Sequence, residues 1–265
     1  MVSLFPSRAV ALVVGPLSVH WYGLMYALAF LLGAFLLPYL LRFRSLSLSS
    51  RDRESLLMHL FLGVVVGGRV GYVLFYGLSY FLAHPLSVFA VWEGGMSSHG
   101  GFVGVAIALL LFSRKHRIHP LALADVLMIP IALGLALGRL GNFINGELYG
   151  TLTTVPWAMY FPGVDGLRHP TQIYAILKDL CIASVSFLHL RSTVQNPIVG
   201  RTTSYFLMTY ALLRSLVEVY RDQPFGFVDM GIVSLSYGQI YTMPVVILGI
   251  ILWLYSGTLH RRQTA

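Results

Sequence analysis

Polar side chains that could bind a phosphate gather where an apolar segment ends, within Gly134–Gly150. Arg139 lies in apolar sequence, and Asn142 and Glu147 follow it within eight residues. A buried guanidinium is costly in a membrane unless it has a partner, and it can hold a phosphate through two hydrogen bonds. The glycines that share one face of this helix and leave room for a ligand are Gly134, Gly138 and Gly141. The alternative is an arginine that reaches the membrane surface beside a polar loop.

A second polar stripe is predicted on one helix face, with residues spaced by 4, 4 and 3: Tyr210, Arg214, Glu218 and Arg221. Side chains at these spacings are neighbours on a helix, so Arg214 and Glu218 can pair. The stripe is either a structural ion-pair network or, together with Arg139, part of a cationic pocket for a phosphate. A phospholipid is the anionic ligand that a membrane supplies, so we favour the pocket.

His99 is the candidate for proton transfer, because histidine titrates near neutral pH. Glycines precede and follow it, and Gly94 and Gly100 predict backbone that lies close to a ligand. A structural histidine is the alternative. Arg69, a second arginine within an apolar segment, needs a partner or water. Tyr22, at the entry to the first apolar run, is expected to be an aromatic anchor at head-group depth.

Composition places the chain in a membrane. Of its 265 residues, 57% are hydrophobic and only 11% are charged, and the mean hydropathy is +0.75. The net charge of +8 comes from basic residues in the gaps between apolar runs, which argues against nucleic acid as a partner. Cys181 is the single cysteine, so an internal disulfide is excluded. We expect no cofactor, and no metal, because no group of histidine, cysteine and carboxylate residues has ligand spacing.

We predict an all-α, polytopic membrane protein whose residues 1–265 form a single domain. The approximate spans are Trp21–Leu41, Leu56–Tyr76, one that ends near Phe112, Leu121–Leu140, Thr171–Leu190, Thr202–Tyr220 and Gln239–Ser256. An interfacial segment precedes the first of these seven spans. An outer loop region covers about residues 142–170, which is long enough to expect a functional role.

The basic residues predict the orientation of these spans. Eleven lysine and arginine residues lie in the C-terminal tail and in the loops after spans one, three and five, against three on the opposite side. The C-terminus is therefore expected in the cytoplasm and the N-terminus outside, with the candidate site toward the outer face. From the residues alone, a phospholipid enzyme, a phospholipid or anion transporter and a structural or receptor-like protein all remain open.

Five stretches resemble the bacterial phosphatidylglycerol–prolipoprotein diacylglyceryl transferase family. They are His20–Tyr26, Gly67–Tyr76, Gly94–Gly101, Gly138–Gly150 and His169–Tyr174, followed by the stripe that ends at Arg221. The resemblance runs from about residue 20 to residue 240. It implies an enzyme of the bacterial inner membrane with seven spans and an outer N-terminus, the topology that the charges predict.

The resemblance also implies a reaction and a set of site residues. Members of the family move the diacylglyceryl group of phosphatidylglycerol onto the lipobox cysteine of a prolipoprotein, forming a thioether and releasing glycerol phosphate. The implied catalytic residues are His99, the suggested base for the thiol, with Arg139, Arg214 and Glu218 at the phosphate. The implied substrate-binding residues are Tyr22, Arg69, Gly94, Gly100, Asn142, Glu147, Tyr210 and Arg221. Two departures from the family pattern are Ala175, where an acid is usual, and Lys178 beside Asp179 in mid-span.

Overall fold

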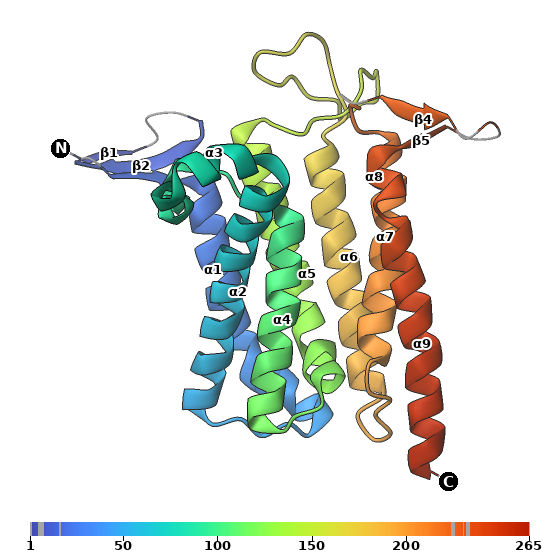
Figure 1. Cartoon of the computed structure of the whole chain (residues 1–265). Helices are drawn as coiled ribbons and strands as arrows, with labels where there is room; N and C mark the ends of the chain where they lie inside the picture. Colours follow the sequence, from blue (N-terminus) through green and yellow to red (C-terminus); the bar gives the residue numbers. More distant parts are fainter. Residues whose placement is uncertain are drawn as a thin grey trace. The chain divides into compact units, whose positions relative to one another are not determined.

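The computed structural model describes residues 2–4, 8–15, 17–223, 226–229, 231 and 234–264, and they are mostly helical (Figure 1). The chain forms two compact units. Unit 1 comprises Met1–Leu37 and Asp125–Ala265, and unit 2 comprises Pro38–Ala124. That residues 1–265 form a single domain stays a prediction.

Seven helices in the described residues have 19 to 27 residues. They are α1 (Trp21–Leu41), α2 (Ser50–Tyr76), α4 (Ser98–His116), α5 (Pro120–Asn145), α6 (Thr171–Ser192), α7 (Arg201–Val219) and α9 (Met243–Thr264). Within the described chain, five helical segments are long and apolar enough to cross a membrane, and α4 and α7 are not among them. The protein is therefore polytopic, while seven spans remain a prediction.

Unit 2 is built on the contact between α2 and α4, with α3 (Leu78–Ala83) and the short 3-10 helices η1 (Arg42–Arg44), η2 (Pro85–Phe89) and η3 (Val91–Glu93). Gly63, Gly67 and Gly71 of α2, which are spaced by four residues, make this contact. A Cβ at Gly67 would lie 2.7 Å from the Cα of Gly104, and one at Gly71 would lie 2.7 Å from the Cα of Gly100. Only glycines let the two backbones approach so closely.

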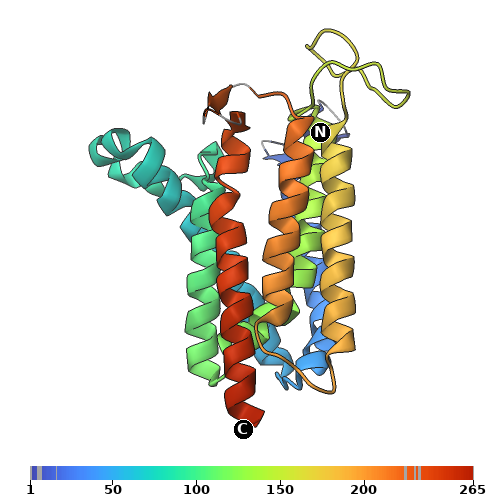
Figure 2. The ribbon, with the colours of Figure 1, turned by 90° about the vertical axis from the view of Figure 1, so that its right-hand side faces the viewer.

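Unit 1 places α7 between α6 and α9 (Figures 1 and 2). Its core contains Ile182 of α6 and Phe206 of α7. The carboxylate of Asp125 in α5 is fully buried and accepts hydrogen bonds from the backbone N–H groups of Gly200 and Thr203, at 2.9 and 2.8 Å. It thereby satisfies donors at the start of α7, which no intrahelical carbonyl can reach, and ties α7 to α5.

Two small antiparallel sheets accompany the helices, and the fold is mostly helical. One has the order β1 (Val2–Leu4), β2 (Val10–Val14) and β3 (Leu17–His20), and the other pairs β4 (Phe227–Asp229) with β5 (Ser234–Ser236), just before α8 (Tyr237–Ile240). The valine-rich residues of β2 were predicted as an interfacial segment. They are too few to span a membrane, and β-branched side chains favour a strand once partners are available.

The loop region that was predicted at about residues 142–170 lies between α5, which continues to Asn145, and α6. The loop is held by backbone hydrogen bonds. The N–H of Gly150 donates to the carbonyl of His169 at 2.8 Å, and the N–H of Thr151 donates to that of Tyr220 at 2.9 Å. The loop is thus joined to the residues that follow α7, and in Figure 2 it extends beyond the same end of unit 1 as the β4–β5 sheet.

Candidate active site

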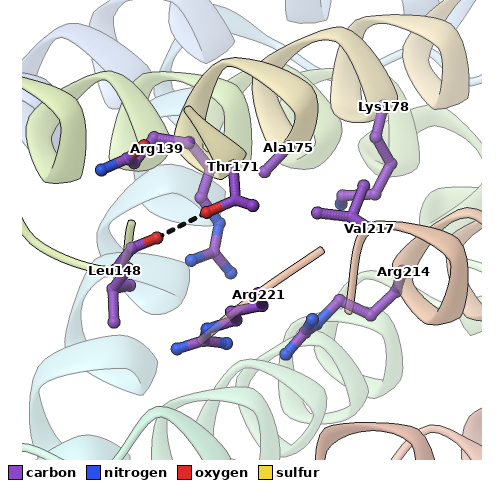
Figure 3. Close-up of a pocket in the computed structure, with 9 residues that line it drawn as sticks. Arg139, Leu148, Thr171, Ala175, Lys178, Arg214, Val217 and Arg221 are labelled. Atoms are coloured by element: carbon purple, nitrogen blue, oxygen red, sulfur yellow. Dashed lines mark hydrogen bonds between the residues drawn. The ribbon is translucent and has the colours of Figure 1, made fainter. Parts of the chain in front are cut away.

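A pocket in unit 1 gathers three arginines from two distant parts of the sequence (Figure 3). Its lining consists of Arg139, Leu148, Thr171, Gln172, Ala175, Lys178, Arg214, Val217 and Arg221. The three arginine side chains come from α5, from α7 and from the residues after α7, and we call this site the arginine pocket. The predicted meeting of Arg139 with the charged stripe of α7 is therefore seen in the structure.

Glu218 organises two of these arginines. Its carboxylate is paired with Arg214, and its Oε2 lies 3.6 Å from the Nη1 of Arg221. Gln223 donates to the Glu218 Oε1 at 3.2 Å. Glu218 is only 4% exposed, so these partners compensate a charge that would be costly to bury alone. The pairing of Arg214 with Glu218 is the one predicted from their spacing of four residues.

Asn142 organises the third arginine. Its side-chain oxygen accepts from the Nη1 of Arg139 at 3.4 Å, and its Nδ2 donates to the Oε1 of Glu147 at 2.9 Å and to the hydroxyl of Tyr22. Asn142 is buried, in the last turns of α5. The structure thus joins four residues that the sequence assigned to the site, and one of them, Tyr22, comes from the start of α1.

The positive charge of the arginine pocket favours an anionic ligand. Burial, and next the positive charge of Arg139, hold the pKa of Arg221 below its usual value. Two guanidinium groups that repel each other are stabilised together by a ligand with negative charge between them. Helix α6 adds a fourth cation, Lys178, with Asp179 as its partner. The sequence marked this lysine only as unusual in mid-span, and Tyr210 lies beneath it, 4.6 Å from the ammonium to the ring centre.

His99 lies in unit 2, in the first turn of α4. The cap of this helix is Ser97, whose hydroxyl oxygen accepts from the N–H of Gly100 at 3.3 Å. Gly94 has a φ of +87°, so the unusual backbone predicted near His99 is present. Gly100 itself packs against the backbone of α2. A position of His99 beside the arginine pocket stays a prediction.

Arg69 has backbone carbonyls of unit 2 as its hydrogen-bond partners. Its guanidinium donates to the carbonyls of Ser87, Val88, Gly94 and Gly95, at distances from 2.5 to 3.1 Å. The side chain is buried, and it also lies over the ring of Phe81 at 5.0 Å. These bonds tie α2 to the segment that leads into α4. In the structure, Arg69 holds this segment in place through hydrogen bonds to its carbonyls. That Arg69 binds substrate stays a prediction.

Comparison with known proteins gives a consistent result. The profile of the family described as prolipoprotein diacylglyceryl transferase matches residues 9–255. A phosphatidylglycerol–prolipoprotein diacylglyceryl transferase of Nitrosomonas europaea is 43% identical over 251 residues, which cover 93% of this chain and 89% of that protein. Proteins of the same name from Bordetella parapertussis and Polynucleobacter asymbioticus are 45% and 46% identical, over 94% and 90% of this chain and 95% and 92% of theirs.

Proposed function

The chain belongs to the prolipoprotein diacylglyceryl transferase family, and we propose that its arginine pocket holds the phosphate of the lipid donor. Its activity is the transfer of the diacylglyceryl group from phosphatidylglycerol to a prolipoprotein. This activity sets aside the transporter and the structural protein that the residues alone left open. The observation that carries the proposal is the convergence of Arg139, Arg214 and Arg221 on one pocket.

The acceptor is the thiol of the lipobox cysteine in the prolipoprotein signal peptide. The sulfur attacks the glyceryl carbon that is bonded to the phosphate oxygen, and the carbon–oxygen bond breaks as the thioether forms. The oxygen keeps the electron pair, so a phosphodiester with one negative charge becomes glycerol phosphate with two, and the thiol proton is released. Stabilising the charge that develops on this leaving group is the main task of the site.

Arginine side chains suit that task because they stay protonated and present planar pairs of donors. We assign Arg139 and Arg221 to binding the phosphate oxygens, and Arg214 to the oxygen that leaves. Glu218 keeps Arg214 and Arg221 in place through its ion pairs. Asn142, held by Tyr22 and Glu147, orients Arg139.

The thiol must lose its proton, because a free cysteine is only a few per cent ionised near pH 7. We assign proton removal to His99. Its place in the first turn of α4 supports this assignment, because the N-terminal end of a helix favours the negative charge of a thiolate. Gly94 would leave room for the peptide backbone, because nothing lies within 4 Å of the position that its Cβ would take, whereas Gly100 faces α2.

We further propose seven spans in the bacterial cytoplasmic (inner) membrane, with the single domain of residues 1–265 embedded in it. The distribution of basic residues supports an outer N-terminus and a cytoplasmic C-terminus. In Figure 1, the outer loop and the β4–β5 sheet lie at one end of the helices of unit 1, and the C-terminus lies at the other. The arginine pocket would then open toward the outer face.

Purified protein in detergent, supplied with phosphatidylglycerol and a lipobox peptide, tests the proposed site. Arg139→Lys keeps the charge but loses the two-point contact, so the rate of peptide mass gain and of glycerol phosphate release should fall about 100-fold. Arg114→Lys, at the exposed end of α4, is the matched control and should keep full activity. Near-full activity of Arg139→Lys would remove Arg139 from the phosphate site.

A further inference from the structure

Lys178 is a buried cation that the proposed mechanism leaves without a task. The chain has two lysines, and this one lies in the middle of α6 with its side chain only 3% exposed. It lines the arginine pocket, and Figure 3 shows its side chain extending from α6 toward Val217 of α7. A charged group in such a place is costly and calls for a functional explanation.

The partner of Lys178 lies outside the pocket lining. Its ammonium pairs with Asp179, whose carboxylate is not part of the pocket lining. The ammonium of Lys178 is therefore the member of the pair that lies at the pocket surface. Tyr210 adds its ring, whose centre lies 4.6 Å from the ammonium.

A purely structural ion pair accounts less well for the arrangement. The second oxygen of the Asp179 carboxylate is buried and accepts no hydrogen bond within the described chain. A buried pair that leaves an acceptor unsatisfied gains little stability over apolar residues of the same size. Ala175, one turn earlier on α6, is small and leaves space in the same pocket.

We propose that Lys178 makes the arginine pocket discriminate between the two charge states of its ligand, favouring the phosphate monoester product over the phosphodiester of the lipid donor. This inference rests on the proposed function. A phosphodiester carries one negative charge, whereas a monoester carries nearly two at neutral pH. A fourth cation therefore strengthens binding mainly when the second charge develops, which occurs as the carbon–oxygen bond breaks.

The experiment measures inhibition of the full-length protein in detergent by two soluble ligands. Glycerol phosphate represents the monoester, and glycerophosphoglycerol, the head group of the donor without its acyl chains, represents the diester. The test variant carries Lys178→Met together with Asp179→Asn, so that no unpaired charge is left buried. Lys178→Arg keeps the cation, and Lys115→Met, at the exposed end of α4, is the matched control.

We expect the double variant to weaken inhibition by glycerol phosphate about tenfold near pH 7.5 and to change inhibition by the diester less than about twofold. Lys178→Arg and Lys115→Met should keep the preference of the unmodified protein. Near pH 5.5, below the second pKa of the monoester at about 6, the difference between the double variant and the unmodified protein should shrink. Equal weakening for both ligands, or no change for either, would overturn the inference.

A further variant separates this inference from the proposed function. Arg221→Gln removes a guanidinium from the pocket and should weaken inhibition by both ligands. If Arg221→Gln leaves both unchanged, the arginine pocket is not the phosphate site and the proposed function fails. If Arg221→Gln weakens both while the Lys178 double variant keeps its preference for the monoester, only the present inference fails.

Discussion

The backbone of Gly238 lies against the carboxylate of Glu218, so closely that a Cβ at this glycine would come within 2.5 Å of the Glu218 Cδ. Gly238 belongs to the short helix α8, and Glu218 to the last turn of α7. Because Gly238 has no side chain, α8 can cover the carboxylate of Glu218, which positions Arg214 and Arg221. This contact could not be predicted from the sequence, because Glu218 and Gly238 are 20 positions apart.

Gly238→Ala should therefore lower activity by displacing the Glu218 carboxylate. The displaced acid would no longer hold Arg214 and Arg221 together, and we expect kcat to fall about tenfold. Gly33→Ala is the matched control, because a Cβ at Gly33 would make an ordinary contact of 3.7 Å with Pro130. Rates of peptide modification for the two variants provide the measurement, and an unchanged kcat for Gly238→Ala would show that α8 does not position the acid.

Asp125→Asn should destabilise the protein through the start of α7. Asp125 is fully buried, and its carboxylate accepts from Gly200 N and from the N–H and hydroxyl of Thr203. An amide loses the charge and one acceptor, which costs about 2–3 kcal/mol of unfolding free energy. Thermal unfolding in detergent checks this, with Asp165→Asn, at an exposed position of the loop before α6, as the control. Equal melting temperatures would mean that other groups satisfy the start of α7.

Arg69→Gln should loosen the segment between α3 and α4. The four carbonyls that Arg69 contacts would lose their donors, so residues 84–96 should exchange backbone hydrogen faster in deuterated water. Arg51→Gln, at the exposed start of α2, is the control. Unchanged exchange in this segment, together with a higher KM for phosphatidylglycerol, would instead favour the direct substrate contact that the sequence suggested.

Local patterns predicted much of the fold and of the site. The first span was predicted with the bounds that α1 has, because aromatic residues and then basic residues flank one continuous apolar run. The spacing of Arg214 and Glu218 predicted their pairing, since four residues is a local property of a helix. The glycines of α2 share one helix face by their spacing of four residues, although that spacing could not name α4 as the partner.

Interactions between distant residues could not be predicted in this way. Gly238 reaches Glu218 only after the chain has turned back from α7, and no spacing rule covers that turn. The carbonyl partners of Arg69 lie 18 to 26 residues further on, in a segment without strong periodicity. The N-terminal sheet depends on pairing that a short apolar run does not specify.

The central claim is that arginines of the pocket stabilise the charge on the departing phosphate. The most direct measurement compares phosphatidylglycerol with an analogue in which sulfur replaces the oxygen between the glyceryl carbon and phosphorus. Sulfur carries negative charge more readily, so its departure needs less help. Arg214→Gln should slow transfer from the natural lipid about 100-fold or more, and transfer from the sulfur analogue by only about a tenth of that factor. An equal loss for both lipids would contradict the claim, because Arg214 would then act before the bond to the leaving group breaks.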